Sequence, residues 1–364
     1  MAYRMIHVGT GGWGGVWCRD FLPPNVRDGL VEVVAAVDVS PEALKVARKY
    51  LHLREDQCYL DVRQAFEAVR ADFCTVVVPP SVHEEVVDRA LAHDMHILSE
   101  KPIADTLEAS VRIADKVRRA GRKMGVTMSH RFDQDKTTLR EELRSGRHGP
   151  VDYLVCRFTC DCRRFGSWAE WRHRIADPLM VEGAIHHLDI LGDLAGSKCE
   201  KLYARTWRPP WGEYAGDAQG LVLMDFADGA HAQYEGAKCN AVGLNWWTRE
   251  YIRAECRDAT LILNRRRLEA FDHKDSSKGK DSKEGGGRRI RLLKQPKWSN
   301  AWLIEKFVCW LDDDGSPMET AVADNLQSVA MVAAAIQSSR TGRSVDVQGL
   351  LNETVEKVRG REGS

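Results

Sequence analysis

The sequence predicts a two-domain protein in which a doubly wound parallel α/β sheet is followed by an open, mostly antiparallel α+β sheet. A chain of 364 residues with 43% hydrophobic content is long enough for two separate cores. Over residues 1–128, short apolar runs alternate with amphipathic segments, which is typical of parallel strands joined by helices. From residue 129 onward, longer strand-like runs follow one another directly, as they do in antiparallel sheets.

The first domain is expected to span residues 1–128. Five apolar runs predict its buried parallel strands: Met5–Val8, Val31–Val37, Phe73–Val78, His96–Leu98 and Met124–Met128. Apolar residues recurring on one face predict helices at Ala43–Leu51, Val62–Val69 and Leu107–Val117, and a further helix is expected at about Trp13–Phe21. This alternation favours right-handed crossovers and hence a doubly wound sheet.

The second domain is expected to span residues 129–364. Its strands are predicted at Val151–Cys162, Lys201–Trp207, Gln219–Phe226, His231–Ala237 and Trp246–Arg257. Its helices are predicted at Asp133–Ser145, at about Pro178–Leu194 and along the small-residue face Leu326–Ile336. The polar run 274–289 cannot bury enough apolar surface to offset its ordering entropy, so a mobile loop is expected there rather than a nucleic-acid-binding arm.

Charge and composition argue against several classes of function. Lys+Arg and Asp+Glu number 53 each, and this zero formal charge favours neither nucleic acid nor an anionic membrane as a partner. No apolar run approaches the roughly 18 residues of a membrane span. The first residues are predicted to lead directly into a strand, so no signal peptide is expected. We therefore expect a cytoplasmic protein.

Ten cysteines are dispersed along the chain and, without an export signal, are expected to be free thiols. The closest group is Cys156, Cys160 and Cys162, which share one face of a predicted strand. A metal site would need a fourth ligand, and none can be placed beside these three residues. We therefore expect buried thiols that pack like small hydrophobic residues, and we predict no metal site.

The turn after the first strand, Gly9-Thr10-Gly11-Gly12-Trp13-Gly14, has the spacing of a dinucleotide-binding loop. Gly9 permits the tight turn, Gly11 lets the backbone approach a pyrophosphate, and Gly14 lets the following helix pack closely on the sheet. Amides at the start of that helix would face the phosphate charge. Because the loop follows the first strand of an alternating α/β pattern, it predicts a Rossmann cofactor site.

Asp38 ends the second predicted strand and determines the expected cofactor. A carboxylate there accepts both hydroxyls of the adenosine ribose and repels a 2′-phosphate. The next residues, Val39-Ser40-Pro41, include no arginine that would accommodate that phosphate. NAD is therefore predicted in preference to NADP, and Ser40 rather than Asp38 is expected to cap the next helix.

Two further segments supply groups for proton transfer. Lys101 stands in a Glu-Lys-Pro run just past a predicted strand, where doubly wound sheets bind ligands. Burial and the positive charge of an oxidised nicotinamide are expected to lower the pKa of its amine. On the predicted second-domain helix, Glu182, His186 and Asp189 share one face. The neighbouring His187 points roughly 100° away from them. An amine and an imidazole beside a dinucleotide indicate hydride transfer from an alcohol carbon.

Six motifs together resemble the Gfo/Idh/MocA family, named for glucose–fructose oxidoreductase and inositol dehydrogenase. In chain order they are the glycine-rich turn, Val78-Pro79-Pro80-Ser81-Val82-His83, Glu100-Lys101-Pro102, Ser129-His130-Arg131-Phe132, Trp171-Arg172, and the acid-x-x-x-His-x-x-Asp pattern at Glu182, His186 and Asp189. They cover about residues 5–195, and the segment Asp324–Val347 is similar as well.

The resemblance implies an NAD(P)-dependent dehydrogenase that acts on a ring secondary alcohol of a sugar, glycoside or cyclitol. In such enzymes the lysine of Glu-Lys-Pro and the histidine of the second-domain helix flank the reacting carbon. This implies catalytic roles for Lys101 and His186, together with Glu182. The family usually has aspartate where Glu182 stands, so orienting His186, contacting substrate and carrying a proton all stay open for this residue.

Binding residues are expected from both domains. Cofactor contacts are expected from Gly9, Gly11, Gly12, Trp13, Gly14, Asp38, Pro79, His83, Glu100, Lys101 and Arg172. Substrate contacts are expected from His130, Trp168, Trp171, His173 and His187. Aromatic faces beside arginines suit the C–H face and the hydroxyls of a sugar or cyclitol ring. Trp246 and Trp247, by contrast, are expected on opposite faces of a strand.

Two other interpretations remain open. A lyase or glycosidase would oxidise its substrate transiently, eliminate across the ring and return the hydride, retaining its NAD. A non-catalytic NAD-binding regulator would tolerate the loss of Lys101 and His186. In each case the second domain would bind the small molecule, and its open sheet is expected to form a homodimer or homotetramer.

Overall fold

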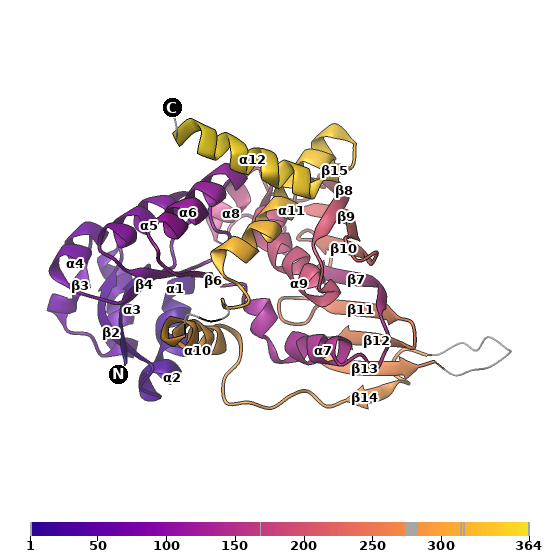
Figure 1. Cartoon of the computed structure of the whole chain (residues 1–364), viewed down its shortest axis with the longest axis horizontal. Helices are drawn as coiled ribbons and strands as arrows, with labels where there is room; N and C mark the ends of the chain where they lie inside the picture. Colours follow the sequence, from indigo (N-terminus) through magenta and orange to yellow (C-terminus); the bar gives the residue numbers. More distant parts are fainter. Residues whose placement is uncertain (1, 168, 274–282, 314, 316, 363–364) are drawn as a thin grey trace. The chain divides into compact units, whose positions relative to one another are not determined.

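The computed structural model describes residues 2–167, 169–273, 283–313, 315 and 317–362. The chain divides into two compact units (Figure 1). The first unit comprises Met1–Phe132, Pro296–Leu326 and Thr354–Ser364, and the second comprises Asp133–Gln295 and Gln327–Glu353. Trp168 and most of the predicted loop, residues 274–282, lie outside the described residues.

The first unit is built on a parallel six-stranded sheet, as the sequence predicts. In spatial order its strands are β3 (Cys58–Tyr59), β2 (Val31–Val37), β1 (Tyr3–Val8), β4 (Phe73–Val76), β5 (His96–Ser99) and β6 (Met124–Val126). Every neighbouring pair is parallel. The order reverses between β1 and β4, so the carboxyl ends of these two strands border the crevice where doubly wound sheets bind ligands.

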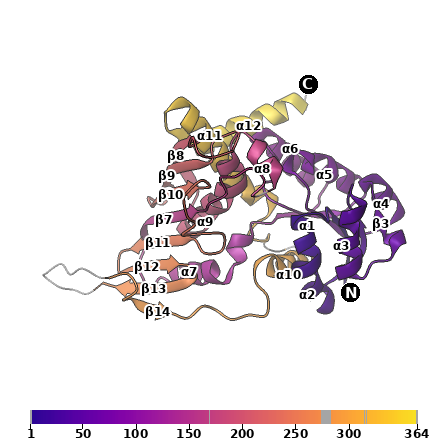
Figure 2. The same cartoon turned by 180° about the vertical axis from the view of Figure 1, so that it is seen from behind.

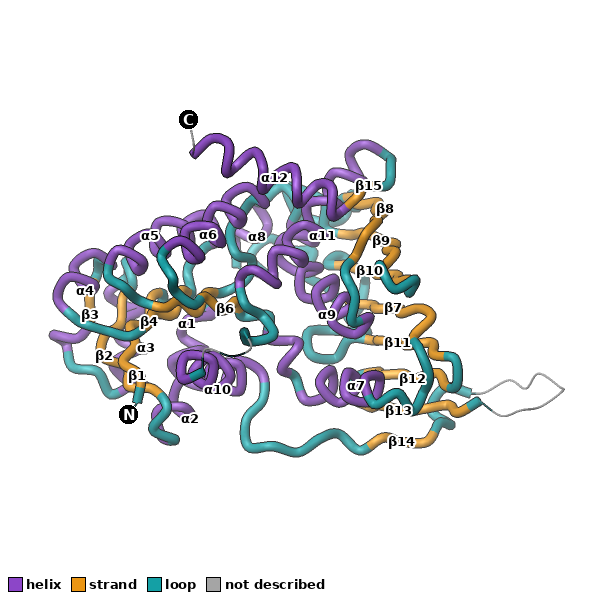
Figure 3. The backbone as a smooth tube through the Cα atoms, viewed as in Figure 1, coloured by secondary structure: helices purple, strands orange, loops and turns teal. Residues whose placement is uncertain are grey.

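Helices cover both faces of this sheet (Figure 3). They are α1 (Trp13–Val16), the π-helical η1 (Trp17–Phe21), α2 (Leu22–Arg27), α3 (Pro41–Leu51), α4 (Val62–Ala68), α5 (His83–Ala92), α6 (Leu107–Arg119) and α10 (Ser299–Asp312). Short 3-10 turns occur at η2 (Glu55–Gln57), η3 (Pro80–Val82) and η4 (Ser129–Phe132). The helix predicted at about Trp13–Phe21 therefore continues to Arg27, with a π segment in its middle.

The core of the first unit includes a helix from far along the chain. Phe307 of α10 packs edge-to-face on Phe73 of β4, with ring centroids 5.3 Å apart, and Leu303 and Ile304 are fully buried in the same cluster. The predicted continuous second domain, residues 129–364, is therefore wrong in its C-terminal part. The physical reason is that α10 contributes its apolar face to the first sheet.

The second unit contains a nine-stranded, mostly antiparallel sheet (Figure 2). Its strands, in spatial order, are β14 (Arg288–Ile290), β13 (Arg267–Asp272), β12 (Ala259–Asn264), β11 (Tyr251–Cys256), β7 (Val151–Thr159), β10 (His231–Ala237), β9 (Gln219–Phe226), β8 (Cys199–Trp207) and β15 (Val345–Asp346). Among the described strands of this second sheet, only the β7–β10 pair is parallel. The predicted loop 274–289 ends in β14, which begins at Arg288.

Helices lie against one face of this sheet, and the other face is open. The helices are α7 (Gln134–Arg144), α8 (Glu170–Arg174), the π-helical η5 (Leu179–Ala184) and α9 (Ile185–Ala195), while α11 (Val322–Thr341) and α12 (Val347–Glu362) each run from one unit into the other. The open face carries exposed apolar side chains at Tyr203, Trp207, Leu221 and Leu223. The predicted open sheet is confirmed.

One local prediction is wrong, and one is confirmed with a difference in helix type. Trp246 and Trp247 precede β11 instead of lying within a strand, because the chain turns at Thr248, whose φ is +62°. The helix predicted at about Pro178–Leu194 is present but begins with the π-helical turn η5 before continuing as α9. π-helical turns are rare and occur frequently at functional sites.

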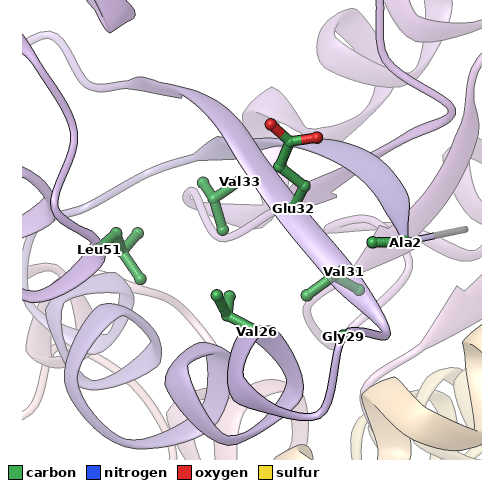
Figure 4. Close-up of a pocket in the computed structure, with 7 residues that line it drawn as sticks. All are labelled: Ala2, Val26, Gly29, Val31, Glu32, Val33 and Leu51. Carbon is green, nitrogen blue, oxygen red and sulfur yellow. The ribbon is translucent and has the colours of Figure 1, made fainter.

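An open pocket of the first unit does not coincide with the ligand-binding edge of its sheet. It is lined by Ala2, Val26, Gly29, Val31, Glu32, Val33 and Leu51. Figure 4 shows Val26, Val33 and Leu51 around a common space beside the start of β2. Since the crevice of a doubly wound sheet lies at the carboxyl ends of its strands, this pocket is not the cofactor site. Among the described residues, no helix is both long enough and apolar enough to span a bilayer.

Candidate active site

The glycine-rich turn forms a cradle that admits no side chain at two positions. Gly9 has a φ of +92°, and a Cβ atom there would lie 2.1 Å from the Val77 carbonyl oxygen. A Cβ at Gly14 would lie 2.0 Å from the Gly9 carbonyl oxygen. The helix that starts at Trp13 can therefore approach β1 only because position 14 is glycine, and the turn can approach the end of β4 only because position 9 is glycine. The helix thus begins just after the carboxyl end of β1, and a helix N-terminus in this place suits an anionic phosphate.

Asp38 lies beside this turn, at the end of β2. Its Oδ2 atom accepts hydrogen bonds from the backbone N–H groups of Thr10 (2.7 Å) and Gly11 (2.9 Å). Ser40 caps α3, with its hydroxyl accepting from the Ala43 N–H at 3.4 Å, as predicted. The glycine cradle and an acidic residue at the end of β2 are the features that a dinucleotide requires, so the residues present fit NAD.

A buried histidine that lies outside the sequence motifs contacts the glycine-rich turn. His7 of β1 is fully buried, with Nδ1 2.7 Å from the Thr75 hydroxyl and Nε2 3.4 Å from the Gly14 carbonyl oxygen. Burial lowers the pKa of His7 to about 4, so the ring is neutral at physiological pH. The only sequence signal for it is a polar residue in an apolar strand.

The turn that carries Lys101 is bound to the first helix through Glu100. The Oε1 atom of Glu100 accepts hydrogen bonds from the indole N–H groups of Trp13 (2.7 Å) and Trp17 (3.0 Å). Its Oε2 atom accepts from the backbone N–H of Lys101 at 3.2 Å. The Lys101–Pro102 peptide bond is cis. Trp17 was not predicted to belong to the site, because its partner is distant in the sequence.

His83 binds the same turn from the other side. Its Nδ1 atom lies 3.1 Å from the carbonyl oxygens of both Pro102 and Ile103, and its Nε2 atom lies 2.9 Å from that of Val78. Burial lowers the pKa of His83, although these carbonyl groups oppose that effect. Pro79 precedes the short η3 turn between these elements. The fully buried ring thus joins the end of β4 to the Lys101 turn.

In the second unit, Glu182 is paired with two cations. Its Oε2 atom contacts the ammonium group of Lys238, and its Oε1 atom lies 3.2 Å from Nε of Arg172. Glu182 and Lys238 are both almost completely buried. Lys238 was missed by sequence reasoning, and its only signal is a lysine directly after the buried strand β10. Because both carboxylate oxygens have a cationic partner, this geometry favours an ionised Glu182.

The two adjacent histidines of α9 have different surroundings, as their helical spacing predicts. His186 is edge-to-face with Trp247 at a centroid distance of 6.0 Å. His187 is stacked with Phe158, Tyr234 and Trp247 at 4.8–5.7 Å, and its Nδ1 atom lies 3.1 Å from the Tyr234 hydroxyl. Burial lowers the pKa of His187. The ring of His187 is therefore a neutral part of an aromatic core.

A buried chain of charged groups continues from His187. Its Nε2 atom lies 3.6 Å from one oxygen of Glu250, and the other oxygen of Glu250 lies 2.7 Å from the Lys136 ammonium group. Lys136 also pairs with Asp133 at 3.3 Å and with Asp135 at 3.5 Å. Burial raises the pKa of Asp133 to about 7. On the same helix as the histidines, Asp189 accepts a 2.6 Å hydrogen bond from Ser328.

The other predicted binding residues that the structure describes lie in α8 and in the short turn η4. Trp171 is partly exposed on α8, and the Arg172 guanidinium lies over its ring at 4.7 Å. His173 is buried and stacked on Tyr214 at 4.1 Å, with Nε2 3.1 Å from the Cys162 carbonyl oxygen. His130 lies in η4 of the first unit. All ten cysteines fall within the described residues and are free, which confirms that prediction.

Comparisons with known proteins agree with this fold. Residues 4–128 match the model of the oxidoreductase family with an NAD-binding Rossmann fold, and residues 140–347 match that of the family's C-terminal alpha/beta domain. The uncharacterised protein y4oX of Sinorhizobium fredii is 53% identical over 351 residues, which are 96% of this chain and 97% of that protein.

Two other proteins have more informative descriptions. The D-apiose dehydrogenase of Rhizobium rhizogenes is 25% identical over 88% of this chain and 91% of its own length. A crystal structure of an oxidoreductase from Agrobacterium radiobacter, in complex with NAD+, L-tartaric acid and magnesium, has a TM-score of 0.82 at 20% identity and covers 96% of this chain and 100% of that one. Relatives of this chain thus include sugar and cyclitol dehydrogenases. The chain belongs to the Gfo/Idh/MocA oxidoreductases and has their NAD-binding Rossmann domain and their C-terminal α/β domain.

Proposed function

We propose that the protein is an NAD-dependent dehydrogenase that removes a hydride from a ring secondary alcohol of a sugar, glycoside or cyclitol. The observation that carries this proposal is the bonding of the Lys101 turn, through Glu100, to the helix that follows the glycine cradle. The backbone that carries the Lys101 amine is thereby held at the carboxyl edge of a cofactor-binding sheet. The proposal includes action in the cytoplasm.

Bound NAD would supply the hydride acceptor, and the protein's own residues do the rest. The cradle at Gly9–Gly14 and the carboxylate of Asp38 bind the cofactor's pyrophosphate and adenosine ribose. The Lys101 amine or the His186 imidazole accepts the hydroxyl proton while the carbon–hydrogen bond breaks with its electron pair. The balanced products are a ketone, NADH and one proton. Such acid–base assistance contributes on the order of 10²–10⁴ in rate.

Glu182 has a supporting role in this proposal. Lys238 and Arg172 each engage one of its carboxylate oxygens, so a proton on Glu182 would displace one of two cations. We therefore assign Glu182 to electrostatic orientation of the site near His186 and not to proton transfer. Its extra methylene, compared with the family's usual aspartate, gives the reach for both cations.

Aromatic and basic groups of α8 are proposed to select a ring-shaped polyol. The partly exposed Trp171, with Arg172 over its ring, offers an apolar face beside hydrogen-bond donors. His130, His173, His187 and Trp168 remain proposed substrate contacts. For His173 and His187, burial favours an indirect contribution through the packing of neighbouring side chains.

A substrate panel tests the proposed function. Purified protein is mixed with NAD and with monosaccharides, glycosides or inositols, and NADH is followed by its absorbance. We expect stoichiometric NADH with at least one ring polyol. Elimination products without net NADH would contradict the proposal in favour of the NAD-retaining lyase or glycosidase. NAD binding without turnover of any panel member would favour a regulator.

The open sheet face is proposed as the contact of a homodimer or homotetramer. Tyr203, Trp207, Leu221 and Leu223 are exposed together on adjacent strands β8 and β9. A patch of this kind on a soluble protein marks an interaction surface. Light scattering should give a dimer or tetramer for the natural chain and a smaller species for Leu223→Lys. A monomer in both cases would contradict this assignment.

A further inference from the structure

The side chain of Glu100 accepts three hydrogen bonds from neutral N–H donors of the first unit. The indoles of Trp13 and Trp17 both donate to Oε1, and the backbone N–H of Lys101 donates to Oε2. Glu100 is buried, with 8% of its surface exposed. One carboxylate therefore joins the helix of the glycine cradle directly to the residue that carries the reactive amine.

The inner donor, Trp17, is itself rigidly placed. Its ring is fully buried, edge-to-face with Phe21 at 6.0 Å and stacked near His7 at 6.2 Å. His7 in turn bonds to Thr75 of β4 and lies next to the Gly14 carbonyl oxygen. Trp17 thus has its position fixed by the sheet and by the cradle before it donates to Glu100.

The residue on the other side of Lys101 is fixed as well. His83 lies 3.1 Å from the Pro102 carbonyl oxygen and links it to the end of β4 through Val78. The backbone on both sides of Lys101 is therefore immobilised, from the helix at Glu100 and from the strand at Pro102.

We propose that Trp17 and Glu100 are positioning residues that fix Lys101 relative to the glycine cradle, with Trp13 as a second donor. This inference rests on the proposed function and assigns Glu100 an internal task in place of a cofactor contact. A phenylalanine at position 17 would keep an aromatic ring in the core while removing the N–H donor, and the small cavity that it leaves is matched by the control below. The N–H group matters because a displacement of about 1 Å of a catalytic group can cost about 10²-fold in rate.

A double-mutant cycle tests whether Trp17 acts through Glu100. Trp17→Phe removes the N–H donor and keeps an aromatic ring. We expect kcat to fall about tenfold, since the misplacement is smaller than 1 Å, with KM for NAD changed less than about twofold. In a Glu100→Ala background the same substitution should have no further effect. Equal losses in both backgrounds would overturn the proposal, because Trp17 would then act only on packing.

Matched variants separate positioning from general damage. Trp302→Phe, on α10 of the same unit, removes an indole that packs on Phe132 and Trp298, and it should leave kcat unchanged. Glu100→Gln keeps an oxygen that can accept from the indoles, so it should retain more activity than Glu100→Ala. If Glu100→Ala does not fold, the cycle is run with Glu100→Gln and Trp13→Phe. Additive losses there would overturn the proposal, and coupled losses would support it.

A second readout does not depend on turnover. The rate at which trace acetic anhydride modifies the Lys101 amine is measured against pH by peptide mass spectrometry. Loosening the turn should raise this rate at least threefold in Trp17→Phe and leave it unchanged in Trp302→Phe. If no polyol is oxidised, the proposed function fails, and the labelling experiment alone tests the positioning role. An increased labelling rate of Lys101 in Trp17→Phe would then support that role. An unchanged labelling rate would overturn it.

Discussion

The two units hold their functional side chains by different physical means. In the first unit, the Lys101 turn is fixed by indole and backbone N–H groups and by a buried, predominantly neutral imidazole. In the second unit, Glu182 is held by Lys238 and Arg172 in a buried ion-pair cluster. Neutral hydrogen-bond donors orient a side chain without bringing another full charge into the core. In a buried ion pair, by contrast, each charge is tolerated in the core only because its partner compensates it.

This difference predicts how substitutions in the two units should affect catalysis and stability. A neutral network can lose one donor and keep its fold, so its variants should mainly alter catalysis. A buried ion pair that loses one member leaves an uncompensated charge, so its variants should mainly alter stability. The predictions below test this division, beginning with the largest expected effect.

Replacing Lys101 should affect catalysis far more than folding. Lys101→Ala removes the proposed proton acceptor and should lower kcat by about 10²–10⁴. The Kd for NADH, measured by fluorescence titration, should change little, because the cradle and Asp38 are untouched. Lys101→Arg, which keeps the charge but holds its proton, serves as the matched control and should also be slow. Near-normal turnover in Lys101→Ala would remove this residue from the mechanism.

Replacing Lys238 should affect folding more than any first-unit variant. Lys238→Met removes a buried cation that pairs with Glu182 and should lower the free energy of unfolding by about 3–5 kcal/mol. Calorimetry should show a lower melting temperature, which the double variant Lys238→Met/Glu182→Gln largely restores. Lys45→Met, which breaks only the exposed pair with Glu42, is the control and should change nothing measurable. Equal melting temperatures for both single variants would contradict the comparison.

Acid should weaken the first unit through His7. Burial lowers the pKa of its ring from 6.5 to about 4, so the unfolded chain binds the proton first. Its contribution to stability is therefore complete above pH 6.5 and is lost as the pH falls through 4, at up to about 1.4 kcal/mol per pH unit. Urea unfolding across this range should show a shallower pH dependence in His7→Leu than in the natural chain. An unchanged slope would contradict the assignment.

Asp133 in the second unit should have the opposite dependence. Burial raises the pKa of its carboxyl from 3.8 to about 7, so the folded chain keeps the proton longer. Its contribution to stability is complete below pH 3.8 and is lost as the pH rises through 7. Relative to the natural chain, Asp133→Asn should therefore be more stable near pH 8 than near pH 4, on top of a constant cost for the lost pairing with Lys136. A difference independent of pH would show that titration of Asp133 is not responsible.

Cofactor preference should give the smallest effect. The natural chain should bind NAD more tightly than NADP, because the Asp38 carboxylate repels a 2′-phosphate. Asp38→Ser should reduce that preference by about tenfold, or about 1.4 kcal/mol. Isothermal titration with both cofactors measures it, and Glu42→Ser on the exposed start of α3 provides a control. Tighter NADP binding by the natural chain would contradict the prediction.

Local sequence patterns correctly predicted those features of the fold that a few consecutive residues determine. Runs such as Val31–Val37 and the glycine spacing give both the parallel sheet and the cradle, because each is set by a few consecutive residues. The return of α10 to the first sheet was not predicted, since the pairing of Phe73 with Phe307 joins residues far apart in the chain. Lys238 was missed for the same reason.

Turn chemistry explains the remaining errors. Trp246 and Trp247 look like part of a strand, but Thr248 takes a positive φ and moves β11 onward to Tyr251. The spacing of Glu182 and His186 predicted a helix but gave no sign of the π-helical turn η5. Such a turn depends on tertiary contacts more than on intrinsic propensity.

The interleaving of the units along the chain has a consequence for synthesis. The nucleotide-binding part cannot complete its core until α10, which ends at Asp312, has emerged from the ribosome. A nascent chain of 132 residues would present the Phe73 face of its sheet to solvent, and eight of the nine strands of the second sheet, β7 to β14, would be translated before that face is covered. A fragment cut at the end of the parallel sheet should therefore aggregate, and only a chain that includes residues 296–326 can yield a stable excised nucleotide-binding unit.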